Sequence, residues 1–267
     1  SVSAADLRGI FMHDATTGYS VGSSGRIWKT TNGGYNWDLY AGTTTIQAFS
    51  SIDFYNTQYG FVSGNSGQVW RTIDGGSNWT SVSNTGSTVG MNGLAVIDSV
   101  TALTAGGTNI FKTTDGGTTF TTITPGVPIG PISRVRMRTA TTGYLVGGSG
   151  TSSTGYVFKT TDAGLTWTNK NFPFSGTMLY DIKFRNDSDY VIVGYSGGVF
   201  HTTNDGGSWQ QINLGLLNVV QSQVIGLTFV SQDTIIVGGN GASLVKVAFE
   251  PIVPVELSSF SASVFSD

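Results

Sequence analysis

Apolar and polar residues alternate in short runs along this chain of 267 residues, and the runs recur at regular intervals. Six of them carry apolar residues at the fourth and sixth positions: LRGIFM, FSSIDF, MNGLAV, ISRVRM, LYDIKF and VIGLTF. A period of two is typical of a β-strand that buries one face. The pattern therefore predicts a chain built almost entirely of short β-strands.

Each unit continues with a second run that ends on glycine and a third that carries one large apolar residue. The terminal glycines are Gly22, Gly64, Gly106, Gly147, Gly194 and Gly238. We expect glycine there because the chain can then turn with a positive φ. The large residues of the third run are Trp28, Trp70, Phe111, Phe158, Phe200 and, in the sixth unit, Val245.

The pattern Thr-x-Asp/Asn-x-Gly-x-x-Trp/Phe joins the third run to a short fourth run in the first five units. Its acidic or amide residue and its aromatic residue are Asn32 and Trp37, Asp74 and Trp79, Asp115 and Phe120, Asp162 and Trp167, and Asn204 and Trp209. We expect the Asp or Asn side chain to accept hydrogen bonds from backbone N–H groups of a tight hairpin, with the aromatic ring folded beneath it. This is a structural role.

The spacing of these elements, 42, 41, 47 and 42 residues, is typical of stacked four-stranded units. The sequence predicts an all-β, six-bladed β-propeller of four-stranded antiparallel blades over residues 1–249. Five blades carry the hairpin element, and the sixth is atypical because it lacks the element and a fourth strand.

The hairpin pattern resembles the Asp box, or bacterial neuraminidase repeat. The longer frame GYSVGSSGRIWKTTNGGYNW is similar to propellers of the photosystem II assembly factor family. The resemblance spans about residues 7 to 249 and implies the propeller fold. It implies no activity, because the Asp boxes of related enzymes lie at hairpins away from the active site.

The tail, residues 250–267, departs from the repeat and holds both glutamates of the chain, Glu250 and Glu256. Its segment VPVELSSFSASV resembles the start of the C-terminal module of proteins exported by bacterial type IX secretion, which implies a secreted or cell-surface protein. We expect the tail to cover the open edge of the sixth unit within the same molecule. The alternative is pairing with a neighbouring molecule, which would produce self-assembly.

Composition argues against several classes of partner and site. The formal net charge is -3 and there is no Lys/Arg tract, so neither nucleic acid nor an anionic membrane is an expected partner. With no cysteine and two histidines, we expect no thiolate or histidine metal site and no cofactor. No apolar stretch approaches the roughly 20 residues of a membrane span. The start at Ser1 without an apolar leader suggests a trimmed, mature product.

Catalysis is the minority interpretation. A sialidase needs a Glu beside its Tyr nucleophile, and no Glu precedes Glu250. Xyloglucan-cleaving propellers place paired aspartates between two propellers, whereas this chain provides one. The aspartates outside the hairpin element and before the tail are Asp6, Asp14, Asp38, Asp53, Asp98, Asp181, Asp187, Asp189 and Asp233. Those at 14, 98 and 233 follow first strands as turn residues do, and RNDSDY lacks the Gly and Glu of a calcium loop. We therefore expect a non-catalytic binding or assembly module for a protein or polysaccharide, the alternative being a glycan-acting hydrolase.

Charged first strands are one departure from the repeat. Arg134 and Arg136 in unit four, and Asp181 and Lys183 in unit five, occupy positions that are mostly small or neutral in the other units. First strands line a propeller axis, so these side chains should meet there. An internal ion pair between Asp181 and one of the arginines is the favoured interpretation, and an anion-binding pocket is the alternative.

Two further groups admit a structural and a binding interpretation. The basic column on the third strands is predicted to be a solvated row: Lys29, Arg71, Lys112, Lys159, His201 and Lys246. Phe172, Phe174 and Tyr180 lie in or beside the connection from unit four to unit five. We expect them to be buried between blades, and a sugar- or partner-stacking surface is the alternative.

Overall fold

The computed structural model describes residues 7–82, 85–127, 130–149, 154–212, 224–231, 234–239 and 244–248. These residues form strands and three short 3-10 turns, η1 (Ser23–Gly25), η2 (Asn65–Gly67) and η3 (Tyr195–Gly197). No helix in this part of the chain is long and apolar enough to span a membrane. Asp6, Asp233 and the tail, with its predicted pairing, lie outside the described residues.

The strands form six antiparallel sheets, each in chain order. Blade one contains β1 (Leu7–Met12), β2 (Gly18–Gly22), β3 (Arg26–Thr30) and β4 (Asp38–Gly42). Blade two contains β5 (Phe49–Phe54), β6 (Gly60–Gly64), β7 (Val69–Thr72) and β8 (Thr80–Ser81). Blade three contains β9 (Met91–Val96), β10 (Ala102–Gly106), β11 (Asn109–Thr113) and β12 (Thr121–Ile123).

The second half repeats this arrangement. Blade four contains β13 (Ile132–Met137), β14 (Gly143–Ser149), β15 (Thr154–Thr160) and β16 (Thr168–Asn169). Blade five contains β17 (Leu179–Phe184), β18 (Tyr190–Gly194), β19 (Val199–Thr202) and β20 (Gln210–Ile212). Blade six has three described strands, β21 (Val224–Ser231), β22 (Thr234–Gly239) and β23 (Leu244–Ala248).

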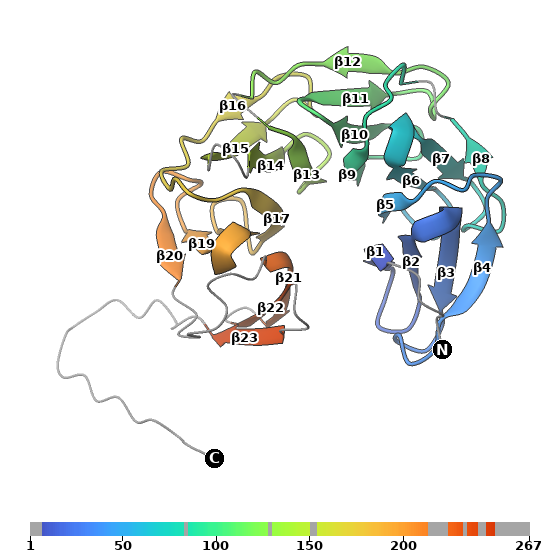
Figure 1. The fold of residues 1–267 in the computed structure, drawn as a ribbon, viewed down its shortest axis with the longest axis horizontal. Coiled ribbons are helices and arrows are strands. Elements are labelled where there is room, and N and C mark those ends of the chain that lie inside the picture. Colours follow the sequence, from blue (N-terminus) through green and yellow to red (C-terminus); the bar gives the residue numbers. More distant parts are fainter. Residues whose placement is uncertain are drawn as a thin grey trace.

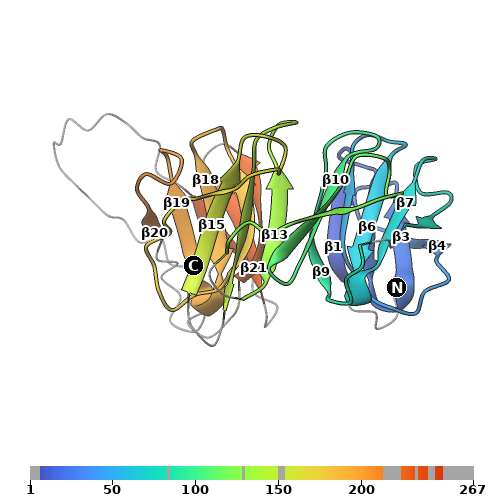
Figure 2. The ribbon, with the colours of Figure 1, turned by 90° about the horizontal axis from the view of Figure 1, so that it is seen from above.

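The blades are arranged around an axis with the first strand of each innermost (Figure 1). Seen edge-on, the strands run between the two faces of the ring (Figure 2). This arrangement confirms the predicted six-bladed β-propeller. Because the inner strands converge, side chains from blades far apart in the sequence share the space around the axis.

The glycine that ends each second strand has a different role from the one predicted. Gly64 has an extended backbone with a φ of -167°, and Gly194 has one of -157°, so neither needs the left-handed region. A Cβ on Gly64 would lie 2.2 Å from the carbonyl oxygen of Ala48, and one on Gly194 would lie 2.5 Å from that of Met178. Glycine is required there because the backbone before the first strand approaches too closely for a side chain.

The glycine that ends the second strand of the sixth blade differs from the predicted one by one position. In blade one, Leu7 pairs with Gly22, whereas in blade six the equivalent Val224 pairs with Gly239. The terminal glycine of that blade is therefore Gly239 and not Gly238. Two consecutive glycines end this run in the sequence, and the pairing of Val224 identifies the second as the equivalent of Gly22.

The core lies between blades and not inside any one of them. Tyr19, Val21 and Ile27 of blade one pack against Ile52 and Phe54 of blade two. The other junctions repeat this packing; for example, Tyr144, Val146 and Val157 of blade four belong to one cluster with first-strand residues of blade five. Each blade therefore needs a neighbour on both faces to bury its apolar side chains.

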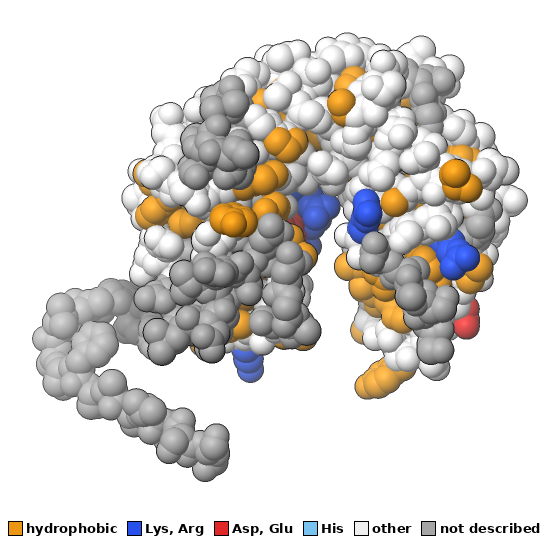
Figure 3. Space-filling model, viewed as in Figure 1, with side chains coloured by type: hydrophobic (Ala, Val, Ile, Leu, Met, Phe, Trp, Pro, Cys, Tyr) orange, Lys and Arg blue, Asp and Glu red, His pale blue; other side chains and the backbone are white. Residues whose placement is uncertain are grey.

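Blade one has no such neighbour on one face among the described residues. Leu7 and Ile10 of β1 are 48% and 65% exposed, whereas the equivalent Phe49 and Ile52 of β5 are 0% and 5% exposed. Figure 1 shows an opening between β1 and blade six, and the space-filling view in Figure 3 shows it too. The described blades thus form an open ring.

Candidate functional site

The five hairpin elements share one hydrogen-bond pattern. In blade three, the Thr113 hydroxyl donates to Oδ1 of Asp115 at 2.9 Å and accepts the Gly117 N–H at 2.8 Å, and Asp115 Oδ1 accepts the Thr119 N–H at 2.9 Å. The same bonds recur around the acceptors at the other four hairpins, Asn32, Asp74, Asp162 and Asn204. The predicted role as backbone acceptor is therefore confirmed in all five.

The aromatic residues of the hairpins pack against the core in four of the five blades that carry the element. Four of the five, Trp79, Phe120, Trp167 and Trp209, are partly buried against the clusters between blades. The fifth, Trp37, packs beside Gly34 of its own hairpin and belongs to none of these clusters. The hydrogen bonds from Thr119, through its hydroxyl and its N–H, lower the pKa of Asp115 to about 2. A carboxylate with all these bonds satisfied locally is a turn acceptor and has no spare basicity for catalysis.

The basic column does not form the predicted solvated row. Lys112 is only 9% exposed, and its Nζ donates to the carbonyl oxygen of Ala163 in the next blade at 2.8 Å. Arg71 likewise donates to the carbonyl oxygen of Ser99 in the next blade at 2.8 Å. Lys246 in blade six is exposed. The third strand faces the loops and hairpin of the next blade, so these long side chains link neighbouring blades.

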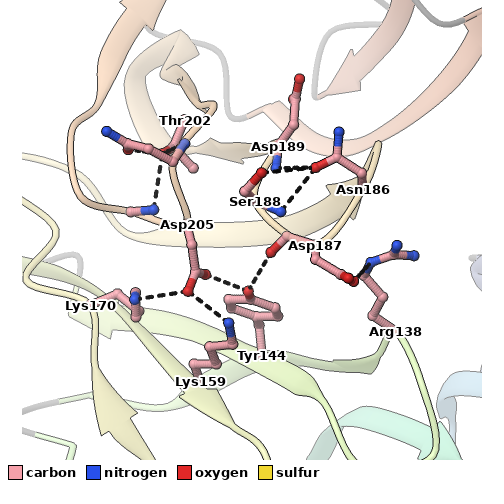
Figure 4. Close-up of polar contacts among 12 residues, drawn as sticks. Arg138, Tyr144, Lys159, Lys170, Asn186, Asp187, Ser188, Asp189, Thr202 and Asp205 are labelled. Atoms are coloured by element: carbon pink, nitrogen blue, oxygen red, sulfur yellow. Dashed lines mark hydrogen bonds and ion pairs between the residues drawn. The ribbon is translucent and has the colours of Figure 1, made fainter.

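Asp205 makes the densest of these links (Figure 4). It takes the place of the first glycine in its hairpin, with a left-handed φ of 57°. Its carboxylate accepts the Tyr144 hydroxyl at 2.5 Å, Lys159 Nζ at 2.7 Å and Lys170 Nζ at 3.1 Å. Burial opposes the charged form, but hydrogen bonds from Lys159, Tyr144 and Lys170 hold the pKa of Asp205 below its usual value. The group fastens blade four to blade five.

The aspartates of RNDSDY also hold cations of the protein itself. Arg138 Nε lies 2.5 Å from Oδ1 of Asp187, a contact visible in Figure 4. Nη1 of Arg185 lies 3.1 Å from Oδ2 of Asp189, and Nε2 of His201 lies 2.8 Å from Oδ1 of the same carboxylate. In the described part of the chain, no group of three or more His, Asp or Glu side chains could hold a metal ion.

Two of the remaining aspartates are turn residues, as predicted. Asp14 accepts the backbone N–H groups of Thr16 and Thr17 at 2.6 and 2.8 Å. Asp98 accepts those of Val100 and Thr101 at 2.8 Å. Both carboxylates close the loop between a first and a second strand.

The three aromatic residues predicted around the connection from blade four to blade five lie in two different places. Phe172 and Phe174 are partly buried against Phe200 and Trp209, with ring centroids 4.9 Å apart for Phe172 and Phe200. Tyr180 instead lines the mouth of a cavity on the axis. The three rings therefore do not form one stacking surface.

The axial cavity is the site that brings the predicted charges together. It has a volume of about 610 Å³ and continues into a mouth region of about 620 Å³. Arg134 and Arg136 of β13 and Asp181 and Lys183 of β17 line it. In Figure 3, Lys and Arg side chains flank the central hollow beside a small acidic patch.

The predicted ion pair forms in the cavity wall. Arg136 donates from Nε to Oδ1 of Asp181 at 2.9 Å, and Arg134 Nε lies 3.4 Å from the same oxygen. Asp181 is 4% exposed. Burial opposes its charged form, but the charges of Arg136 and Arg134 outweigh it and hold the pKa of Asp181 below its usual value. Burial lowers the pKa of Lys183, and the charge of Arg136 lowers it further.

Sequence reasoning missed two members of this site, Arg8 and Asp53. Asp53 occupies in β5 the position that Arg136 occupies in β13, since they pair with Phe61 and Tyr144 at equivalent places. Its Oδ2 accepts the Val96 N–H at 2.8 Å. Aligning all six first strands by position would have placed Asp53 in the charged column. Arg8 precedes that column and carries no comparable signal.

Four cationic side chains therefore share the cavity with two anionic ones. Asp181 neutralises part of this charge through its ion pairs, while Arg8 and Lys183 have no ion pair among the described residues. A partly enclosed, net positive cavity favours an anionic group, since electrostatic interactions strengthen away from bulk water.

A sequence profile described as "Photosynthesis system II assembly factor YCF48" matches residues 3–134 and 127–218. No curated protein matches the chain in sequence. A solved structure of YCF48 bound to D1 peptide is 16% identical, with 93% of this chain and 95% of that chain covered and a TM-score of 0.54. YCF48 from Cyanidioschyzon merolae is 15% identical, with 93% and 97% covered and a TM-score of 0.58.

Glycoside hydrolase propellers show a similar fold. An ancestral GH74 enzyme is 16% identical, with 89% of this chain and 37% of that chain covered and a TM-score of 0.64. The GH74 xyloglucanase from Xanthomonas campestris is 13% identical, with 86% and 43% covered and a TM-score of 0.68. At these identities the likeness shows the fold alone, and this chain spans less than half of either enzyme chain.

Proposed function

Because the chain belongs to the photosynthesis system II assembly factor YCF48 family, we propose that it is a non-catalytic propeller that binds a segment of another protein during assembly. The axial cavity is the proposed binding site. The observation that carries the proposal is the net positive charge of this cavity, which four cationic and two anionic side chains line.

The ligand class follows from this charge and from the related propeller. YCF48 is known in a structure with D1 peptide bound, which supports a peptide as ligand here. The mouth of the cavity offers hydrogen-bonding side chains from several blades, among them Asn92 and Tyr180. An extended peptide with acidic side chains would place its polar backbone at the mouth and a carboxylate near Lys183.

Fluorescence anisotropy with labelled ten-residue peptides tests this proposal. An acidic peptide should bind and a basic peptide of the same length should not. Arg8→Ala and Lys183→Met should each weaken the acidic peptide about 3- to 10-fold. Arg26→Ala is the matched control for Arg8, because Arg26 is also exposed in blade one but lies outside the cavity. Equal binding of acidic and basic peptides, or equal loss in the control, would reject the axial site.

A glycan-acting hydrolase is the second candidate, and one observation favours it. The two aspartates of the cavity differ in proton affinity: burial raises the pKa of Asp53 to about 6, whereas the pKa of Asp181 is lowered. A pair of this kind can serve as acid and base. Against it, Asp181 is held by two arginines. Turnover of xyloglucan or a chromogenic glycoside that Asp53→Asn abolishes would establish the enzyme and reject the binding module.

Export and self-assembly extend this proposal. We propose a secreted or cell-surface protein, on the strength of the likeness of VPVELSSFSASV to type IX secretion proteins. Immunodetection in the native organism, in intact cells against lysed cells, tests export; signal only after lysis contradicts it.

Deleting residues 251–267 and measuring mass in solution tests whether the tail pairs with a neighbouring molecule: loss of an existing oligomer would indicate pairing between molecules.

A further inference from the structure

We propose that Asp53 sets the net charge of the axial cavity according to pH, so that an acidic peptide binds more tightly as the pH falls from about 7 to about 5. The inference rests on the proposed function, since it concerns the same cavity. It assigns to one residue a role that the ion pair of Asp181 cannot perform.

The two aspartates of the cavity are held differently. Asp181 makes ion pairs with both Arg134 and Arg136 and stays charged. Asp53 makes no ion pair among the described residues; backbone N–H groups are its hydrogen-bond donors there, that of Val96 at 2.8 Å and that of Phe54. Asp53 is half-buried in the cavity wall. A carboxylate that is partly withdrawn from water and has amide donors but no ion-pair partner regains less in contacts than it loses in hydration.

The charges that face Asp53 come from three of the inner strands. Arg8 lies on β1, Arg134 and Arg136 lie on β13, and Asp181 and Lys183 lie on β17. The described residues of β9 and β21 contribute no ionisable side chain.

Asp53 therefore takes up a proton within the physiological range. Burial raises its pKa to about 6, although the N–H groups of Val96 and Phe54 and the charges of Arg136 and Lys183 lower it in part. Above that pH the ionised carboxylate offsets one of the cations. Below it the carboxyl is neutral, and the cavity gains one net positive charge at unchanged geometry.

One other group near Asp53 could titrate in this range. His13 lies just beyond β1, and its ring packs against Phe11 and Phe54 at centroid distances of 4.9 and 4.8 Å. Burial lowers the pKa of this histidine below 6.5. Because it could also add positive charge in acid, the experiment includes a variant at this position.

The test measures the affinity of the acidic ten-residue peptide at pH 5.0, 6.0, 7.0 and 8.0. The wild type should gain about 3- to 10-fold in affinity between pH 8 and pH 5, the effect of one unit charge within the cavity. Asp53→Asn should bind with the tighter affinity at every pH. Asp98→Asn, at a turn carboxylate, and His13→Gln should keep the wild-type dependence.

A second readout does not depend on the peptide. The carboxyl carbon of Asp53, followed by NMR in the free protein, should titrate near pH 6. Titration near pH 4, or equal pH dependence in the wild type and Asp53→Asn, would overturn the inference and leave the proposed function intact. Loss of the dependence in His13→Gln alone would overturn it in favour of the histidine. Failure of the peptide to bind at any pH would overturn the proposed function, and this inference with it.

Discussion

Arg136 donates from Nε to Oδ1 of Asp181 at 2.9 Å and so joins the inner strand of blade four to that of blade five. The same carboxylate also faces Arg134. Asp181→Ala would leave two arginines without their counter-charge in a partly buried wall. We expect a loss of about 3 to 5 kcal/mol in the free energy of unfolding, measured by urea denaturation. Asp98→Ala is the control for losing a carboxylate. Equal losses in both variants would show that the pair contributes nothing specific.

The hydroxyl of Thr113 is the second target. Thr113 is 1% exposed and its Oγ1 accepts the Gly117 N–H, so Thr113→Val leaves that buried donor without its partner. We expect a loss of about 1 to 3 kcal/mol in the free energy of unfolding. The neighbouring Thr114 is exposed, and Thr114→Val should change stability by less than about 0.5 kcal/mol. Calorimetry on the two variants measures this difference; similar melting temperatures would contradict the stabilising role of the Thr113 hydroxyl in the hairpin.

Acid should weaken the hairpins that carry aspartate and spare those that carry asparagine. Hydrogen bonds lower the pKa of Asp115 and of Asp162 to about 2, below the unfolded value of 3.8. Because the folded pKa is the lower one, this stabilisation is complete above about pH 4 and is lost as the pH falls towards 2. Replacing both aspartates with Asn should flatten the decline in stability over that range. Parallel curves for the variant and the wild type would disprove the assignment.

The open ring predicts unequal effects of one substitution at two equivalent positions. Ile10 is 65% exposed and Ile52 is 5% exposed, although both occupy the fourth position of a first strand. Ile52→Ala should cost about 2 to 5 kcal/mol through lost burial and the cavity left behind. Ile10→Ala should cost less than about 1 kcal/mol. Equal costs would mean that blade one is covered in solution and that the ring closes.

Local sequence rules were sufficient for the strands and hairpins because those features depend on short-range chemistry. Alternation in FSSIDF defines β5, and the bonds around Asp115 involve residues within four positions of it. The glycine at Gly64 was predicted in the right place for the wrong reason, since its neighbour Ala48 is brought close only by pairing of β5 with β6. Contacts of this kind are invisible to local patterns.

The site required comparison between blades. Arg136 and Asp181 could be predicted to meet because each interrupts a column of mostly small or neutral residues on the first strands. Asp53 of blade two escaped notice because its environment depends on cations of other blades, Arg136 of blade four and Lys183 of blade five. Phe172 was one of three candidate aromatic residues, and only the packing of its ring on Phe200 shows that it belongs to the core.

The location of the bound peptide is the most direct test of the central claim. The chain has no cysteine, so a single thiol can be placed at will. Asn92→Cys puts it at the mouth of the axial cavity, where Asn92 is exposed, and Ser77→Cys puts it on an exposed hairpin. Saturating acidic peptide should slow alkylation at position 92 at least about 10-fold and leave position 77 unchanged. Protection at 77 and none at 92, or equal rates at 92 with and without bound peptide, would contradict binding in the axial cavity.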